Sequence, residues 1–142
     1  MELNELYTEV ITEYSQSKKH HHPIEHSDVC VRGVNPSCGD DITLDLRMND
    51  NTIEQIALSG SGCAISKASA EMMAELMEGR TKEEALQLVA TFLGMIKKTV
   101  TEEKDLDALE NAVAFQNISN MPARVKCAVL AWHTMEEAIH KL

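Results

Sequence analysis

A thiol and a carboxylate lie two positions apart in the sequence N-P-S-C-G-D, residues 35–40. Cys38 and Asp40 flank Gly39, and the free backbone angles of a glycine allow a turn to aim both side chains at one point. Sulfur and carboxylate oxygen are both metal ligands. The spacing therefore suggests a metal site, although C-x-D lacks the dense cysteine pairing of a zinc finger.

Two more cysteines could complete such a site. Cys63 follows two glycines at the predicted start of a helix, where unpaired N–H groups and the helix dipole favour a thiolate. Cys127 lies in the predicted last helix, three positions after Arg124, whose cation would lower the pKa of the thiol. The plainer alternatives are a small apolar residue at a strand–helix junction for Cys63 and a solvated charge for Arg124.

The charge of the complete set makes a specific prediction. Three thiolates and one carboxylate around a divalent ion leave a net negative charge, so a buried site needs a compensating cation, and Arg124 is placed to supply it. Soft sulfur ligands suit zinc or an iron-sulfur cluster. Zinc with four protein ligands has no open position, so reactivity would require one ligand to leave. Cys30 is a spare thiol whose participation the sequence leaves open.

The histidines give a weaker signal than the cysteines. A polar connector holds His20, His21, His22 and His26, which could bind a transition metal, but the prediction is a mobile and unspecialised arm. We expect the remaining histidines, His133 and His140, to be exposed on the last helix. The sequence motifs of phosphate-binding loops, zincins and nucleobase deaminases are absent.

Composition limits the class of protein. With 142 residues and 44% hydrophobic composition, we expect a single domain over residues 1–142, with residues 1–26 forming an N-terminal helix and a histidine-containing arm. The net charge of -10 disfavours a nucleic-acid partner and could instead steer a basic protein. The sequence lacks an uninterrupted run of roughly 18 apolar residues, so it predicts no membrane-spanning helix. Four scattered cysteines without a secretory signal indicate a reducing cytoplasm.

Hydrophobic periodicity predicts the elements that position these residues. Apolar spacing of three and four predicts a first helix over Leu3 to Tyr14. Alternation predicts three strands, after which the spacing returns to that of helices. The strands are expected over Val29–Val34, Ile42–Met48 and Thr52–Leu58; the helices run from the glycines near Ser59 to Met77, from Thr81 to Ile96, over Leu106–Phe115 and over Pro122–Ile139.

Turn and cap residues support these limits. Thr81 with Glu84 is a capping-box pattern, Gly79 supplies a helix stop, and Pro122 suits a first helical turn. The charged segment Thr99–Asp105 is expected to be a link. Strands come before most helices, so the predicted fold is α+β: a three-stranded antiparallel sheet covered on one face by helices.

Four local motifs together resemble those of IscU/NifU-type iron-sulfur cluster assembly proteins, and the SufU branch most closely. The resemblance covers nearly all of Leu3 to Ile139. Lys126 stands where the scaffold branch usually has histidine, and extra residues occupy roughly Phe92 to Ile118; both features point toward SufU. The motifs are N-P-S-C-G-D at Asn35, S-G-S-G-C-A-I-S-K-A-S at Ser59, T-K-E-E-A-L at Thr81 and P-A-R-V-K-C-A at Pro122.

This resemblance implies a function and assigns roles. It implies that Cys38, Asp40, Cys63 and Cys127 bind zinc, and that the protein is a sulfurtransferase that accepts persulfide sulfur from a SufS-like, pyridoxal-phosphate-dependent cysteine desulfurase. Cys38 would be the acceptor, and Arg124 a catalytic helper beside it. Other iron-sulfur assembly proteins would be further partners. The alternatives are a scaffold that assembles a transient [2Fe-2S] cluster on the same four residues, and a closed structural zinc site.

Overall fold

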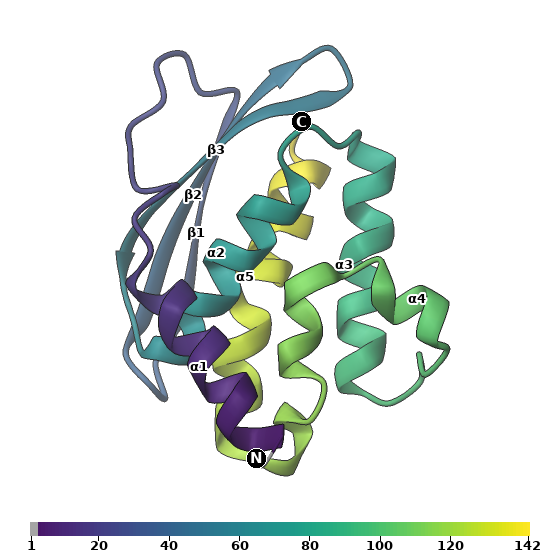
Figure 1. Ribbon diagram of the computed structural model, residues 1–142. Helices are drawn as coiled ribbons and strands as arrows, with labels where there is room; N and C mark the ends of the chain where they lie inside the picture. Colours follow the sequence, from purple (N-terminus) through teal and green to yellow (C-terminus); the bar gives the residue numbers. More distant parts are fainter. Residues whose placement is uncertain (1–2) are drawn as a thin grey trace.

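One helix, a three-stranded antiparallel sheet and a series of helices follow one another along the chain (Figure 1). The computed structural model describes the backbone of residues 3–142 and the side chains from residue 9 onward. The predicted α+β class, the sheet and the N-terminal helix are confirmed. The elements are α1 Leu3–Gln16, β1 Val29–Asn35, β2 Asp40–Asn49, β3 Thr52–Ser61, α2 Ala64–Met77, α3 Lys82–Ile96, α4 Glu103–Asp107, the 3-10 helices η1 Glu110–Phe115 and η2 Ile118–Asn120, and α5 Pro122–His140.

The sheet has the order β1-β2-β3, and helices cover one of its faces (Figure 1). Along β2 buried and half-buried residues alternate, as the period of two predicts. Ile42, Leu44 and Leu46 lie on the buried face, where α2 and α5 pack against the sheet. On α1, Val10, Ile11 and Tyr14 pack against the same core; the side chains of the earlier apolar positions lie outside the described residues.

The strands are longer than predicted at the end near the cysteines. The predicted β2 began at Ile42, and glycines were expected to release β3 at Ser59. Instead, pairing of Asp41 with Ser61 and of Ile42 with Gly60 extends the ladder. A Cβ atom at Gly60 would collide with the backbone oxygen of Asp41, so this glycine permits the strands to approach closely. The prediction ended the strand early because glycine usually disfavours strands, whereas Gly60 here lies within the β2–β3 ladder.

The predicted helix ends are confirmed where cap residues define them. Thr81 Oγ1 accepts the N–H of Glu84 at 3.2 Å, and Glu84 accepts the N–H of Thr81 at 2.9 Å, forming the predicted capping box. Gly79 follows α2 with a φ of 89°. Pro122 occupies the first turn of α5. Within residues 3–142, no helix has the length and apolar character needed to cross a membrane.

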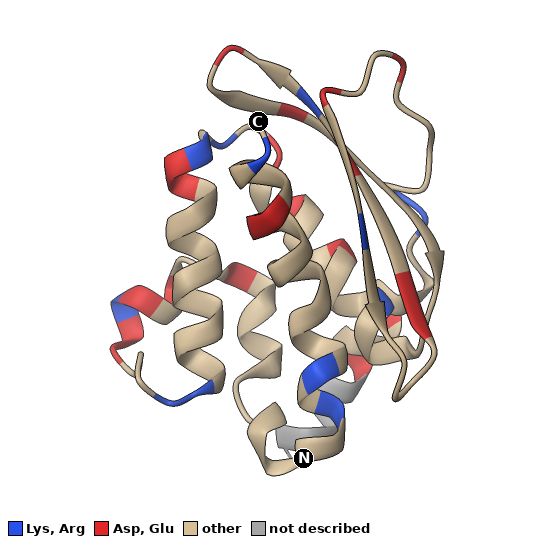
Figure 2. Cartoon of the chain, turned by 180° about the vertical axis from the view of Figure 1, so that it is seen from behind, with Lys and Arg blue, Asp and Glu red and all other residues tan. Residues whose placement is uncertain are grey.

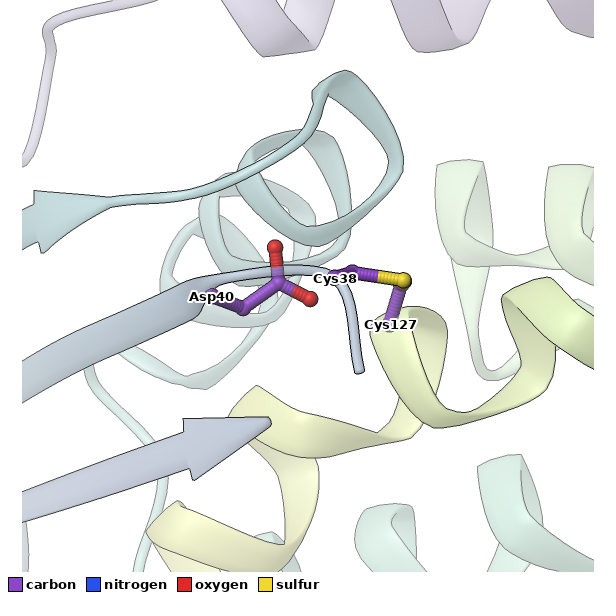
Figure 3. Close-up of side chains that lie close together, drawn as sticks. All are labelled: Cys38, Asp40 and Cys127. Atoms are coloured by element: carbon purple, nitrogen blue, oxygen red, sulfur yellow. The ribbon is translucent and has the colours of Figure 1, made fainter. Parts of the chain in front are cut away.

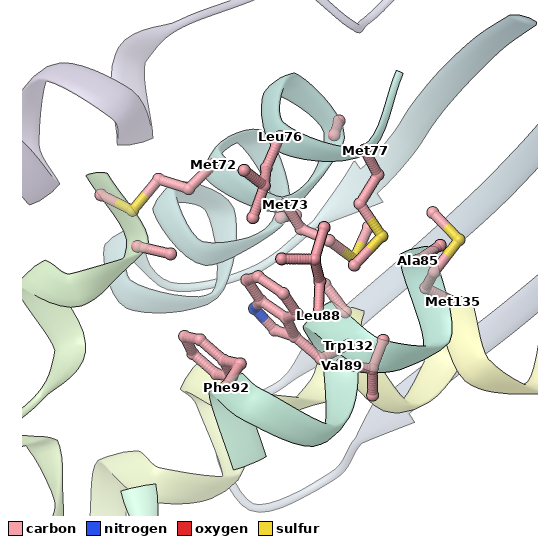
Figure 4. Packing of buried hydrophobic residues seen from close by; sticks show 14 of the residues in the cluster. Met72, Met73, Leu76, Met77, Ala85, Leu88, Val89, Phe92, Trp132 and Met135 are labelled. Carbon is pink, nitrogen blue, oxygen red and sulfur yellow. The ribbon is translucent and has the colours of Figure 1, made fainter. Parts of the chain in front are cut away.

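Aromatic stacking joins α3 to α5 in the core (Figure 4). The rings of Phe92 and Trp132 stack with centroids 3.9 Å apart. The indole Nε1 of Trp132 donates to Ser69 Oγ at 2.9 Å, and Ser69 donates to the carbonyl oxygen of Ala128 at 2.5 Å. These buried hydrogen bonds join α2 to α5 next to Cys127. They therefore fix the two helices that have Cys63 and Cys127 near their N-terminal ends.

The predicted helix over Leu106–Phe115 is wrong as a single α-helix. α4 begins at Glu103, inside the segment predicted to be a link, and the second half forms the 3-10 helix η1. Glu110 has a φ of 49°, which an α-helix does not allow. The buried positions Leu106, Leu109, Ala112 and Phe115 are three residues apart. That spacing matches three residues per turn and explains why a 3-10 helix suits this part of the chain.

The prediction of a mobile, unspecialised histidine arm is wrong at His20. This residue is 1% exposed, and its Nδ1 lies 2.7 Å from Glu71 Oε2, while its Nε2 lies 3.2 Å from Glu78 Oε1. Its backbone oxygen accepts the N–H of Leu58 at 2.8 Å. The arm is thereby fixed to α2 and β3. The two glutamates lie more than fifty positions away in sequence, so local patterns gave no sign of the pairing.

Candidate metal centre

Asp40 enters the site from the sheet. It is the first residue of β2 and is fully buried, on the same face as Ile42 and Leu44. Because side chains alternate along a strand, a carboxylate in phase with buried leucines must point toward the helices. Asp40 therefore lies under the helix layer at the end of the sheet.

The turn between β1 and β2 carries the first thiol. Asn35 and Asp40 pair across the two strands, and the N–H of Cys38 donates to the Asn35 oxygen at 3.3 Å. Gly39 has a φ of 71°, with no other atom within 4 Å of an added Cβ, so the backbone angle and not lack of space favours glycine here. The turn leaves Cys38 half-buried.

Three of the four predicted ligands form one group (Figure 3). The ligand atoms of Cys38, Asp40 and Cys127 all lie within 4.8 Å of one another. Cys38 and Asp40 come from the β1–β2 hairpin, and Cys127 comes from the beginning of α5. The fold therefore brings Cys127 of the last helix next to the C-x-D turn, although the two are far apart in the sequence.

Cys63 lies outside that group but adjoins it. It is the N-cap residue of α2, as the glycines before it suggested. Its backbone N–H donates to Asp40 Oδ1 at 2.8 Å, and its Sγ accepts the N–H of Ser66 at 3.4 Å. Cys63 also contributes to the raised pKa of Cys127. The fourth predicted ligand is therefore attached to the group through Asp40.

Asn35 is a site residue that the sequence reasoning missed. It is 5% exposed, and its Nδ2 donates to Asp40 Oδ2 at 3.1 Å and to Cys127 Sγ at 3.6 Å. A single amide thus holds the hairpin carboxylate and the helix thiol in position. Its place at the start of the N-P-S-C-G-D turn was the available signal, because an asparagine beside a tight turn often bonds locally.

Arg124 brings a positive charge to the exposed side of the site. Its Nη1 lies 3.9 Å from Cys38 Sγ. A hydrogen bond with Cys127 and the nearby Cys38 and Cys63 raise the pKa of the guanidinium. The start of α5 also carries Lys126, so this end of the helix is basic (Figure 2).

The close approach of the thiols and the carboxylate indicates whether these residues suit a metal ion. Burial raises the pKa of Cys127 well above its ordinary value of 9.0, and hydrogen bonds with Cys38, Cys63 and Asp40 raise it further. A cation among these groups would reverse that effect, because metal binding releases the thiol proton. Two sulfurs and a carboxylate oxygen beside a third thiol are a suitable donor set for a soft divalent ion such as zinc.

The remaining cysteine and the histidines of the last helix lie outside the ligand group. Cys30 is exposed on β1 and does not belong to the described ligand group. His133 and His140 are exposed on α5, as predicted. A surface hollow beside the thiol turn is bounded by Val34 and Pro36 from the hairpin side and by Leu130 from α5. Val34 is 48% exposed, and polar residues such as Lys126 and His133 also line this hollow.

Comparisons with known proteins agree on one family. The family described as "NifU-like N terminal domain" matches residues 6–142. An iron-sulfur cluster assembly scaffold protein IscU of Thermotoga maritima is 39% identical, over 96% of this chain and 94% of the relative. A zinc-dependent sulfurtransferase SufU of Bacillus subtilis is 34% identical, over 98% and 92%.

Solved structures give the same result. The crystal structure of an iron-sulfur cluster assembly scaffold protein for the SUF system from Fervidobacterium islandicum superposes with a TM-score of 0.88 at 37% identity. The match covers 96% of this chain and 98% of that chain. The arrangement of sheet and helices described above is therefore that of a solved relative.

Proposed function

The chain belongs to the family of NifU-like N terminal domains, and from this membership we propose that it acts in iron-sulfur cluster assembly as an IscU/SufU-type protein. The finer proposal is that it accepts sulfur in a zinc-dependent manner, with Cys38 as acceptor and a cysteine desulfurase as donor. The 34% identical relative named a zinc-dependent sulfurtransferase supports it.

One observation carries this proposal. Cys38 is the half-buried member of a group whose other members, Asp40 and Cys127, are fully buried. It lies on a turn, and an arginine reaches it from the exposed side at 3.9 Å. A partner can reach this sulfur more readily than the other two groups. Among the grouped residues, Cys38 is therefore the one suited to exchange sulfur with another protein.

The transfer is a thiol–persulfide exchange. The Cys38 thiolate attacks the outer sulfur of a cysteine persulfide on the desulfurase. A sulfur–sulfur bond forms at Cys38, the corresponding bond in the desulfurase breaks, and the desulfurase cysteine leaves as a thiolate. The transferred sulfur keeps its proton and its oxidation state, so the step needs no added oxidant or reductant.

The residues that would hold zinc are Cys38, Asp40, Cys63 and Cys127. When bound, zinc stabilises thiolates without changing oxidation state, which protects them from oxidation. Asp40 is held by Asn35 and by the Cys63 N–H, so its orientation does not depend on the ion. Arg124 supplies positive charge next to Cys38, where the attacking sulfur must be anionic.

The test pairs metal analysis with a desulfurase assay. Freshly purified protein should contain zinc and should stimulate the desulfurase, and Cys38→Ala should abolish the stimulation. Cys30→Ala is the matched control, because this exposed thiol lies outside the ligand group and should leave stimulation unchanged. Full stimulation by Cys38→Ala would refute the acceptor role. Bound zinc without any stimulation by the wild-type protein would leave only a structural zinc site.

A second candidate function is that of a scaffold for a [2Fe-2S] cluster, carried as cargo on the same four residues. Relatives that are 39% and 37% identical are named scaffold proteins, which favours this reading. Asp40 would then be the weak ligand that lets the cluster leave, so Asp40→Ala should retain the cluster longer. Faster cluster loss in Asp40→Ala would count against the scaffold, as would zinc and no iron in the purified protein.

A further inference from the structure

Ser66 presents a hydroxyl group without a hydrogen-bond partner next to the proposed ligands. The residue is fully buried, and within the described part of the chain its Oγ has no partner. Buried hydroxyl groups nearly always have one, because leaving them unpaired is unfavourable. The unpaired state therefore points to an acceptor that becomes available only when the site changes.

The hydroxyl faces the metal centre. A Cβ atom added to Gly62 would lie 3.3 Å from Ser66 Oγ and 2.8 Å from Asp40 Oδ1, so both oxygens border the same small space. The backbone N–H of Ser66 already donates to Cys63 Sγ at 3.4 Å. Ser66 thus lies against Cys63 on one side and near Asp40 on the other.

Comparison with the N-terminal cap of α3 explains why the Ser66 hydroxyl has no hydrogen-bond partner. In α3 the third helical residue, Glu84, accepts the N–H of the N-cap residue Thr81 at 2.9 Å. In α2 the equivalent N–H, that of Cys63, donates to Asp40 from the sheet. Ser66 occupies the position of Glu84 in this cap, but the acceptor role is already taken. Its hydroxyl remains free to donate elsewhere.

We propose that Ser66 is a positioning residue whose hydroxyl donates a hydrogen bond to the Cys63 sulfur when that sulfur is a metal-bound thiolate. A neutral thiol is a weak acceptor, whereas a thiolate accepts strongly. In the described structure Cys63 Sγ accepts the Ser66 N–H, which leaves lone pairs for a second donor. The proposal rests on the zinc site of the proposed function.

We predict that Ser66→Ala changes the melting temperature and the zinc affinity in opposite directions. In the metal-free protein the melting temperature should rise, because an unpaired buried hydroxyl is removed. Zinc affinity, measured by competition with a chelator of known affinity, should fall by about tenfold or more, as it does when groups that orient metal ligands are removed.

Ser69→Ala is the matched control. Ser69 is buried on the same helix, but its hydroxyl accepts from Trp132 and donates to Ala128. The same substitution there should lower the melting temperature and change zinc affinity much less. A purely structural role for Ser66 would make the two variants behave alike.

The outcomes separate this inference from the function on which it rests. Wild-type zinc affinity in Ser66→Ala, or a fall in the melting temperature of its metal-free form, would overturn the role of Ser66 while leaving the zinc site intact. Failure of the wild-type protein itself to bind zinc would overturn the site, and the inference with it.

Discussion

The backbone N–H of Cys63 donates to Asp40 Oδ1 at 2.8 Å. This hydrogen bond joins the first residue of β2 to the N-cap of α2. The other carboxylate oxygen accepts from Asn35 at 3.1 Å. Asp40 therefore organises two proposed ligands in the fold itself, apart from any contact that it makes with a metal.

Replacing Asp40 by alanine should destabilise the metal-free protein. The change leaves the Cys63 N–H without its acceptor and removes the oxygen that accepts from Asn35, which should lower the free energy of unfolding by about 1–3 kcal/mol. Urea denaturation with excess chelator measures this. Asp41→Ala is the control, because that exposed carboxylate pairs with exposed Arg32 and should matter far less. Equal stability of Asp40→Ala and wild type would contradict the organising role.

Replacing Asn35 by alanine should weaken zinc binding. Without the amide, Asp40 Oδ2 and Cys127 Sγ lose the donor that they share, so zinc affinity should fall by about tenfold or more. Chelator competition measures the change. Asn51→Ala, which loses only a hydrogen bond to Glu83 away from the site, should bind zinc as the wild type does. A similar loss in both variants would argue against a specific role.

Replacing Arg124 by alanine should make Cys38 less reactive. The guanidinium lies 3.9 Å from the sulfur, so its positive charge is close to the anionic sulfur that attacks the reagent. Alkylation of Cys38 in metal-free protein at neutral pH, followed by mass spectrometry, should therefore be slower. Arg32→Ala removes another exposed arginine, one that is paired with Asp41, and should leave the rate unchanged. An undiminished rate in Arg124→Ala would remove its proposed role.

The contribution of His20 to stability should depend on pH. Burial lowers the pKa of this imidazole, but the hydrogen bonds and charges of Glu71 and Glu78 outweigh burial and raise the pKa above its ordinary value of 6.5. The charged ring can donate to both carboxylates. Its contribution is therefore fully present below the unfolded pKa and is lost as the pH rises through the folded pKa.

Urea denaturation of metal-free protein over a pH series checks this sign. The stability difference between wild type and His20→Gln should be largest at mildly acidic pH and should shrink as the solution becomes alkaline. His22→Gln, which alters an exposed neighbour, should show no such trend. A difference that grows with pH would mean that His20 is held in its neutral form.

Much of the fold was predictable because its signals are local. The alternation of Ile42, Leu44 and Leu46 gave the sheet face, and the Thr81 capping box gave the start of α3. The same alternation, carried back two positions, places Asp40 on the buried face. The predictions placed Cys63 at the start of a helix and Cys127 in the last helix, but they left Asp40 on the turn before a strand that was expected to begin at Ile42.

The contacts that complete the site are not local. Asn35 meets Cys127 across 92 positions, and His20 meets Glu71 across 51, so no short pattern records either pair. The 3-10 helix after α4 was missed for another reason, since a spacing of three also fits one face of an α-helix. The long-range contacts and the choice between an α-helix and a 3-10 helix both depend on how the chain packs in three dimensions.

The most direct test of the account follows the transferred sulfur. The protein is incubated with a cysteine desulfurase and cysteine, and mass spectrometry then identifies the peptide that has gained one sulfur atom. The account predicts that this peptide carries Cys38 and that a thiol reductant removes the added sulfur. Sulfur found only on Cys63 or Cys127, or on no cysteine while the desulfurase turns over, would contradict it.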